Sequence, residues 1–146
     1  MATIRVTNQS ELVSALKTAA GGDNILLADG NYGDLTIKND YTSTVTIQAE
    51  NPLGASFERI EFSGATNVAV DGLQFTKGLA IKAESAGISV LNSDVDGPIY
   101  CRTVDGLVID NVDVSCNLSI WECSPRFLNM NSFACCSDKC ELILPF

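Results

Sequence analysis

The sequence predicts an all-β fold, a right-handed parallel β-helix with about 20 residues in each coil and a short capping α-helix at its N-terminus. Short apolar segments recur along the chain in two tracks that stay in phase. The first track begins at Val68, Ile88, Leu107 and Leu128, and the second begins at Leu79, Ile99 and Leu118. Two tracks with one spacing indicate that each coil carries several short strands, and that stacked coils pair like strands about 4.8 Å apart. Right-handedness follows from the usual hand of parallel crossovers.

Other folds fit this spacing poorly. The L-x-x-L-x-L frame of leucine-rich repeats is absent, and a β-sandwich would not hold strands of identical pattern in 20-residue register. We expect about five coils in one domain over residues 1–146. Its parts are an N-terminal strand and capping helix (1–24), regular coils (25–115) and Cys-rich last coils (116–146).

The first element is predicted to be a helix from Ser10 to Ala20. Ser10 can cap it, Glu11 lies in the first turn, and Gly21 and Gly22 follow its end. Leu12, Leu16 and Ala19 form its apolar stripe.

Beyond the helix, the chain alternates between apolar and polar residues in short strands. Leu35-Thr-Ile37 and Val45-Thr-Ile47 have the same inward–outward–inward form as the later repeats. One predicted column at a strand end contains Gly72, Asn92, Asn111 and Ser132. Stacked amide side chains there would hydrogen-bond from coil to coil and stabilise the turn.

Two segments resemble pectate-lyase-like β-helix proteins over roughly residues 3 to 115. Gly22-Asp-Asn-Ile-Leu-Leu-Ala-Asp-Gly-Asn-Tyr-Gly33 is similar to their N-terminal cap and first coil, and Val68-Ala-Val-Asp-Gly-Leu-Gln-Phe75 is similar to one of their common coils. The opening also resembles β-helix proteins exported without an N-terminal signal and β-helices of phage virions. In such lyases the catalytic basic residues lie several coils further on, so the resemblance assigns no catalytic residue here. The Cys-rich tail departs from this pattern.

Charge and composition exclude several partners. The net charge is −9, which argues against nucleic acid and anionic membranes, because both would repel the chain. No run approaches the 18 or so apolar residues of a membrane span, and no basic-then-apolar signal peptide opens the chain. We expect an extracellular or virion-associated protein. The chain has no histidine, the usual general base near neutral pH.

The second track predicts a glycan-binding face. Leu79, Ile99 and Leu118 point inward, so the outward column contains Lys82, Arg102 and Trp121, with Tyr100 on the same face. Aromatic rings stack on sugar rings, and cations hold carboxylates or sulfates. A structural alternative is a cation–π ladder of Arg102 and Trp121, with Lys82 solvated.

Asp94 and Asp113 are predicted to lie on neighbouring coils. Like charges that close repel unless a cation neutralises them, so calcium held by Asp94, Asp96 and Asp113 is one interpretation. A solvated acidic column is the other. Asp71, Leu91, Asp110 and Asn131 form a second column in register.

Five of the six cysteines crowd the last coils. Cys101 and Cys123, and Cys116 and Cys136, would occupy adjacent coils, at a separation that a disulfide tolerates. Alternatively, Cys101 and Cys116 are small apolar core residues.

Two functions remain open. One is a non-catalytic module that binds acidic or neutral polysaccharide, or is part of an extracellular or virion assembly. The other is the N-terminal fragment of a polysaccharide lyase that cleaves uronate glycans by β-elimination. The apolar stretch from Cys140 to Phe146 predicts that another protein chain, or residues beyond Phe146, cover the C-terminal end.

Overall fold

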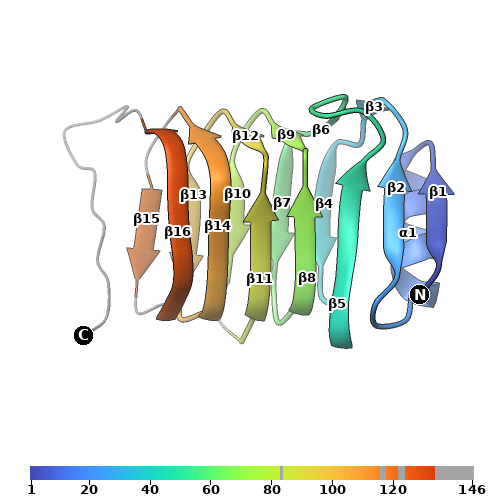
Figure 1. The fold of residues 1–146 in the computed structure, drawn as a ribbon, viewed down its shortest axis with the longest axis horizontal. Helices are drawn as coiled ribbons and strands as arrows, with labels where there is room; N and C mark the ends of the chain where they lie inside the picture. Colours follow the sequence, from blue (N-terminus) through green and yellow to red (C-terminus); the bar gives the residue numbers. More distant parts are fainter. Residues whose placement is uncertain (83, 116–117, 122–123, 134–146) are drawn as a thin grey trace.

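A computed structural model describes residues 1–82, 84–115, 118–121 and 124–133, the last two stretches through their backbone. It confirms the right-handed parallel β-helix (Figure 1), in which successive coils stack along the long axis of the molecule. The solenoid has about six turns, one more than the repeats predicted. No helix within the described ranges is long and apolar enough to cross a membrane.

Each coil contributes strands to three faces. The first face contains β1 (Thr3–Val6), β2 (Asn24–Leu27), β5 (Asp40–Ala49), β8 (Thr66–Asp71), β11 (Ala86–Leu91), β14 (Asp105–Val114) and β16 (Ser124–Phe133). The second contains β3 (Gly30–Asn31), β6 (Ala55–Phe57), β9 (Gln74–Phe75) and β12 (Asp94–Val95), which pairs with the end of β14. The third contains β4 (Asp34–Ile37), β7 (Arg59–Phe62), β10 (Leu79–Ile81), β13 (Ile99–Arg102) and β15 (Leu118–Trp121).

The core is made of like side chains stacked from coil to coil. On the first face, one column of paired residues contains Ile25, Ile47, Val70, Val90 and Ile109, all fully buried. On the second face the ring of Phe57 stacks between those of Tyr32 and Phe75, at centroid distances of 5.4 and 6.1 Å. This burial of apolar surface is the main force that holds the coils together.

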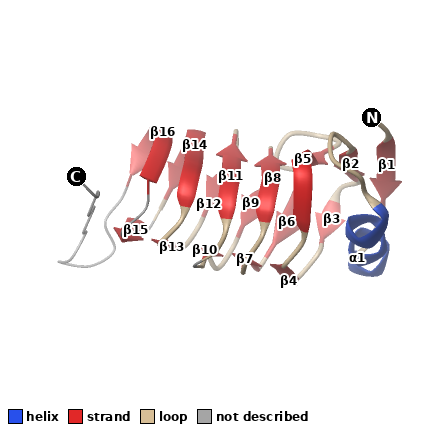
Figure 2. Cartoon of the chain, turned by 90° about the horizontal axis from the view of Figure 1, so that it is seen from below, coloured by secondary structure: helices blue, strands red, loops and turns tan. Residues whose placement is uncertain are grey.

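The N-terminal helix α1 (Gln9–Thr18) lies at the end of the stack beside β1 (Figure 2). Leu12 and Leu16 of the predicted stripe are buried against the first coil together with Ala15, whereas Ala19 follows the helix as its C-cap and is half-buried. The capping residue is Asn8, whose side chain accepts a hydrogen bond from the Glu11 N–H at 2.9 Å. The predicted cap, Ser10, is therefore wrong, because Asn8 already holds the extended backbone that a helix cap requires.

A ladder of amides marks the corner after the first face. Asn111 donates to Asn92 at 2.8 Å, and Asn92 donates to Asp71 at 2.9 Å. Asn92 and Asn111 have φ values of 48° and 55°, in the left-handed region where Asn is among the better tolerated residues. The predicted coil-to-coil ladder is confirmed for Asn92 and Asn111.

The register of the last coil differs from the sequence prediction. Leu128 pairs with Ile109 rather than with Leu107, and Asp110 pairs with Asn129 rather than Asn131. Ser132 lies beside Asp113 instead of Asn111. The cause is a set of register shifts between β14 and β16, which a fixed repeat length cannot anticipate.

We expect Asn92→Ala to lower the free energy of unfolding by about 2 kcal/mol. The variant loses two side-chain hydrogen bonds, and alanine lacks the polar side chain that lets asparagine tolerate the left-handed region. Asn92→Gly keeps the backbone conformation and should cost about half as much. Urea unfolding of the two variants measures the difference. Identical midpoints for both variants and the parent would show that the ladder does not stabilise the corner.

Candidate functional site

The third face carries the candidate site. Outward residues of β13 and residues of the turns after β10 and β13 line a pocket of about 440 Å³, whose described lining residues are Lys82, Tyr100, Arg102 and Thr103. Three of these are residues that the sequence placed on one outward surface. The structure thus brings Lys82, Tyr100 and Arg102 together, and their role in binding glycan stays a prediction.

Strand alternation positions these side chains. Ile99 and Cys101 point into the core and are fully buried, so Tyr100 and Arg102 between and after them point outward. Tyr100 is 41% exposed, one of the few large apolar side chains in the described chain that remain accessible. An exposed aromatic ring beside two cations gives the pocket both an apolar surface and a positive charge.

Lys82 is not simply solvated, as the structural alternative had assumed. Its Nζ lies 2.9 Å from Oε1 of Glu61, on the preceding coil. The two side chains are 52% and 29% exposed respectively, so Glu61 is the more enclosed of the two. The Lys82 ammonium is thus fixed at the edge of the pocket by a neighbouring carboxylate.

Trp121 takes its predicted place in the backbone register. Arg102 of β13 pairs with Trp121 of β15, so the two residues occupy adjacent coils. The side chain of Trp121 lies outside the described part of the structure. Its contribution to the glycan-binding face, or to a cation–π ladder with Arg102, stays a prediction.

A second pocket lies on the same face, two strands away. It measures about 230 Å³, and its described lining residues are Asp34, Leu35, Thr36, Arg59 and Glu61. Glu61 lines this pocket and also binds Lys82 of the first pocket. Ala80 pairs with Glu61 on one side and Tyr100 on the other, and it is only 1% exposed although it points outward.

Sequence reasoning missed Glu61 and Thr103. Ile60-Glu61-Phe62 has the inward–outward–inward form of the second track, and β7 pairs directly with β10, so the signal for Glu61 was present. Thr103 has a φ of 53°, in a region that β-branched residues rarely adopt. No sequence pattern predicts this conformation.

The acidic column lies in the predicted register. Asp94 pairs with Asp113 on one side and with Gln74 on the other. Burial raises the pKa of Asp94, and the nearby charges of Asp113 and Asp96 raise it further. Asp96 accepts a hydrogen bond from the Ser115 hydroxyl at 2.7 Å. Among the described residues no three His, Cys, Asp or Glu side chains are grouped to hold a metal ion, so calcium at Asp94, Asp96 and Asp113 stays a prediction.

Cys101 is fully buried and points into the core. Its proposed partner Cys123, and the pair Cys116 and Cys136, lie outside the described residues. The apolar stretch 140–146 also lies outside the described residues, so its predicted cover by another protein chain stays a prediction.

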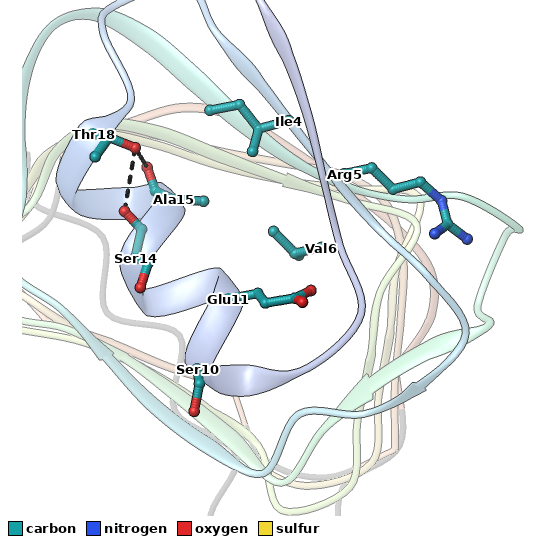
Figure 3. Close-up of a pocket in the computed structure, with 8 residues that line it drawn as sticks. All are labelled: Ile4, Arg5, Val6, Ser10, Glu11, Ser14, Ala15 and Thr18. Atoms are coloured by element: carbon teal, nitrogen blue, oxygen red, sulfur yellow. Dashed lines mark hydrogen bonds between the residues drawn. The ribbon is translucent and has the colours of Figure 1, made fainter.

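The N-terminal cap contains a pocket of about 460 Å³ between β1 and α1 (Figure 3). Its charged side chains serve the fold. Arg5 binds Glu50 at 2.8 Å, and Glu11 accepts hydrogen bonds from the backbone and hydroxyl of Thr7 at 2.6 and 2.8 Å. The Thr18 hydroxyl in turn donates to backbone carbonyls of α1. This pocket belongs to the closure of the solenoid rather than to the candidate site.

We expect Asp94→Asn to stabilise the protein at neutral pH. Because the native state raises the pKa of Asp94, the native state binds this proton more tightly than the unfolded chain. The proton stabilises the native state fully at pH values below 3.8, the usual pKa of an aspartate. This stabilisation is lost as the pH rises through the higher pKa of Asp94 in the native state. Urea unfolding at neutral pH and below pH 3.8 should therefore show an advantage for Asp94→Asn only at the higher pH. Asp40→Asn, an exposed carboxylate outside the column, is the control, and an equal effect there would contradict the prediction.

If Asp94, Asp96 and Asp113 hold calcium, millimolar calcium should raise the melting temperature, because a ligand that binds only the native state stabilises it. Asp94→Asn should abolish this rise, and Asp40→Asn should keep it. An unchanged melting curve for the parent protein would leave the solvated acidic column as the correct interpretation.

Comparison with known proteins identifies the fold through solved structures. No protein-family model matches the chain, and no curated protein matches it. One similar structure is a PL6 family alginate lyase, with a TM-score of 0.57 and 12% identity over 80% of this chain and 24% of the lyase. Another is a PL6 family polysaccharide lyase from Pseudopedobacter saltans, with a TM-score of 0.50 and 21% identity over 80% of this chain and 38% of that protein. The chain thus spans well under half the length of either lyase. It has the pectate-lyase-like parallel β-helix fold.

Proposed function

We propose that this chain is a glycan-binding β-helix module whose binding site is the pocket of Lys82, Tyr100, Arg102 and Thr103. Its ligand is a glycan that carries carboxylate or sulfate groups. The observation that supports the proposal is the presence of two cations and an exposed aromatic ring in one pocket on the third face.

The chemistry of the pocket suits a sugar acid. The exposed ring of Tyr100 offers an apolar surface on which the C–H face of a sugar ring can pack. Arg102 can bind a carboxylate or sulfate through two parallel hydrogen bonds, and Lys82 adds a second positive charge. The net charge of −9 makes this cluster of two cations unusual for the chain, which favours a role in binding an anion.

The lyase fragment is the second candidate, and the similar structures favour it because both are polysaccharide lyases. An elimination needs a group that removes a proton from the sugar. Lys82 is held in an ion pair with Glu61, and the chain contains no histidine. A binding module needs no such group, so we place it first. Such a module can work in an extracellular or virion-associated assembly, where glycans are the accessible polymers.

We expect Arg102→Gln to weaken binding of an acidic oligosaccharide by about tenfold or more, because a charge-assisted hydrogen bond contributes about 1.5 to 3 kcal/mol. Tyr100→Ala should weaken it by a similar factor through the loss of the stacking surface. Titration calorimetry with alginate and hyaluronan oligosaccharides measures both effects. A neutral cello-oligosaccharide should bind more weakly than either.

Lys77→Gln is the matched control, since Lys77 is an exposed lysine that binds Glu58 at 3.0 Å outside the pocket. Equal losses from Lys77→Gln and Arg102→Gln would show that the pocket is not the site. Ultraviolet absorbance of the same mixtures detects the unsaturated uronate that a lyase would release. A steady rise with the parent protein would establish the enzyme in place of the binding module.

A further inference from the structure

We propose that Glu61 is a specificity-determining residue, which restricts the site to glycans whose acidic units are separated by uncharged units. This inference rests on the proposed function, because it takes the pocket of Lys82, Tyr100 and Arg102 as the place where one acidic unit binds. It concerns the neighbouring unit of the same glycan chain.

The two pockets of the third face lie one after the other along the solenoid. Thr36, Glu61, Ala80 and Tyr100 are paired in sequence across β4, β7, β10 and β13. Three strand spacings of about 4.8 Å separate the first from the last, a distance of about 14 Å that accommodates more than one sugar unit. Ala80 has the smallest side chain of this column and lies between the pockets, so no bulky residue of the column separates them.

The two ends of this surface differ in their charged groups, and the ion pair of Lys82 with Glu61 joins them. The described residues of the larger pocket contribute the cations of Lys82 and Arg102 and no carboxylate. In the smaller pocket, Asp34 and Glu61 supply two carboxylates against the single cation of Arg59. A sugar carboxylate would meet two cations at the first end, and at the second it would meet carboxylates that Lys82 and Arg59 offset only in part.

Glu61 lies at the junction of these two ends. It is one of the acidic residues of the smaller pocket. Its ion pair with Lys82 holds its carboxylate beside the larger pocket. Its side chain is only 29% exposed, which weakens the screening of its charge by solvent. A glycan with an acidic group on every unit would bring a second carboxylate toward Glu61 and Asp34. A glycan with an uncharged next unit would bring hydroxyl or amide groups that can donate to them.

The test compares two probes of equal length in titration calorimetry. Hyaluronan oligosaccharides alternate glucuronate with an uncharged N-acetyl sugar, whereas alginate oligosaccharides carry a carboxylate on every unit. We expect the parent protein to bind hyaluronan about tenfold more tightly than alginate, because of like-charge repulsion in the smaller pocket. Glu61→Gln should bring this ratio close to one. Asp34→Asn, which leaves the ion pair of Lys82 intact, should lower the ratio in the same direction.

Glu58→Gln is the matched control, because it removes the ion pair with Lys77 outside both pockets and should leave the ratio unchanged. If the parent binds alginate as tightly as hyaluronan, or if Glu61→Gln and Asp34→Asn leave the ratio unchanged, this inference is overturned while the proposed function stands. If neither probe binds, or if Arg102→Gln has no effect on either, the proposed function fails and the inference fails with it.

Discussion

Pairing of like strands between successive coils is the constraint on which the rest of this structure depends. Each coil closes its hydrogen bonds only through the coils above and below it, so residues about 20 positions apart must match in side-chain direction. Ile47, Val70 and Val90 show the result, because they stack on one another and are fully buried. The same pairing aligns the outward residues, and the candidate site follows from it without any special local conformation in β10 or β13.

This constraint explains why so much of the fold could be predicted from the sequence. Inward positions tolerate little except apolar residues, so the repeat of Val68, Ile88 and Leu107 leaves a clear pattern. The prediction was less accurate where local geometry competes with the repeat. The helix cap is Asn8 and not the predicted Ser10. Hydrogen bonding decides which residue of a short polar stretch caps the helix, and residue spacing alone does not identify it. The last coil shifted register through bulges between β14 and β16, which change the number of residues per coil.

For the candidate site, the sequence predicted the residues on one surface but not their partners. Lys82, Tyr100 and Arg102 were found because they follow inward residues of a recognised repeat. Glu61 was missed since the coil that carries it was not recognised as a copy, although its pattern matches. Thr103 lies in the turn after β13 with a left-handed φ of 53°, which the repeat pattern does not encode. The similar structures show the fold, and the chemistry of this surface is argued from the residues that line it.

The near-complete burial of Ala80 has a consequence for how such a surface can change over evolutionary time. Ala80 points away from the core, so its size is limited by its outward neighbours, among them Glu61 and Tyr100, and not by core packing. A larger residue at this position would have to displace those neighbours, and would change the surface between the two pockets while leaving the solenoid beneath it intact. Duplication of a whole coil would instead extend the surface by one step of about 4.8 Å. The length and the shape of this surface can therefore change while the fold stays the same, the length through the number of coils and the shape through a single side chain.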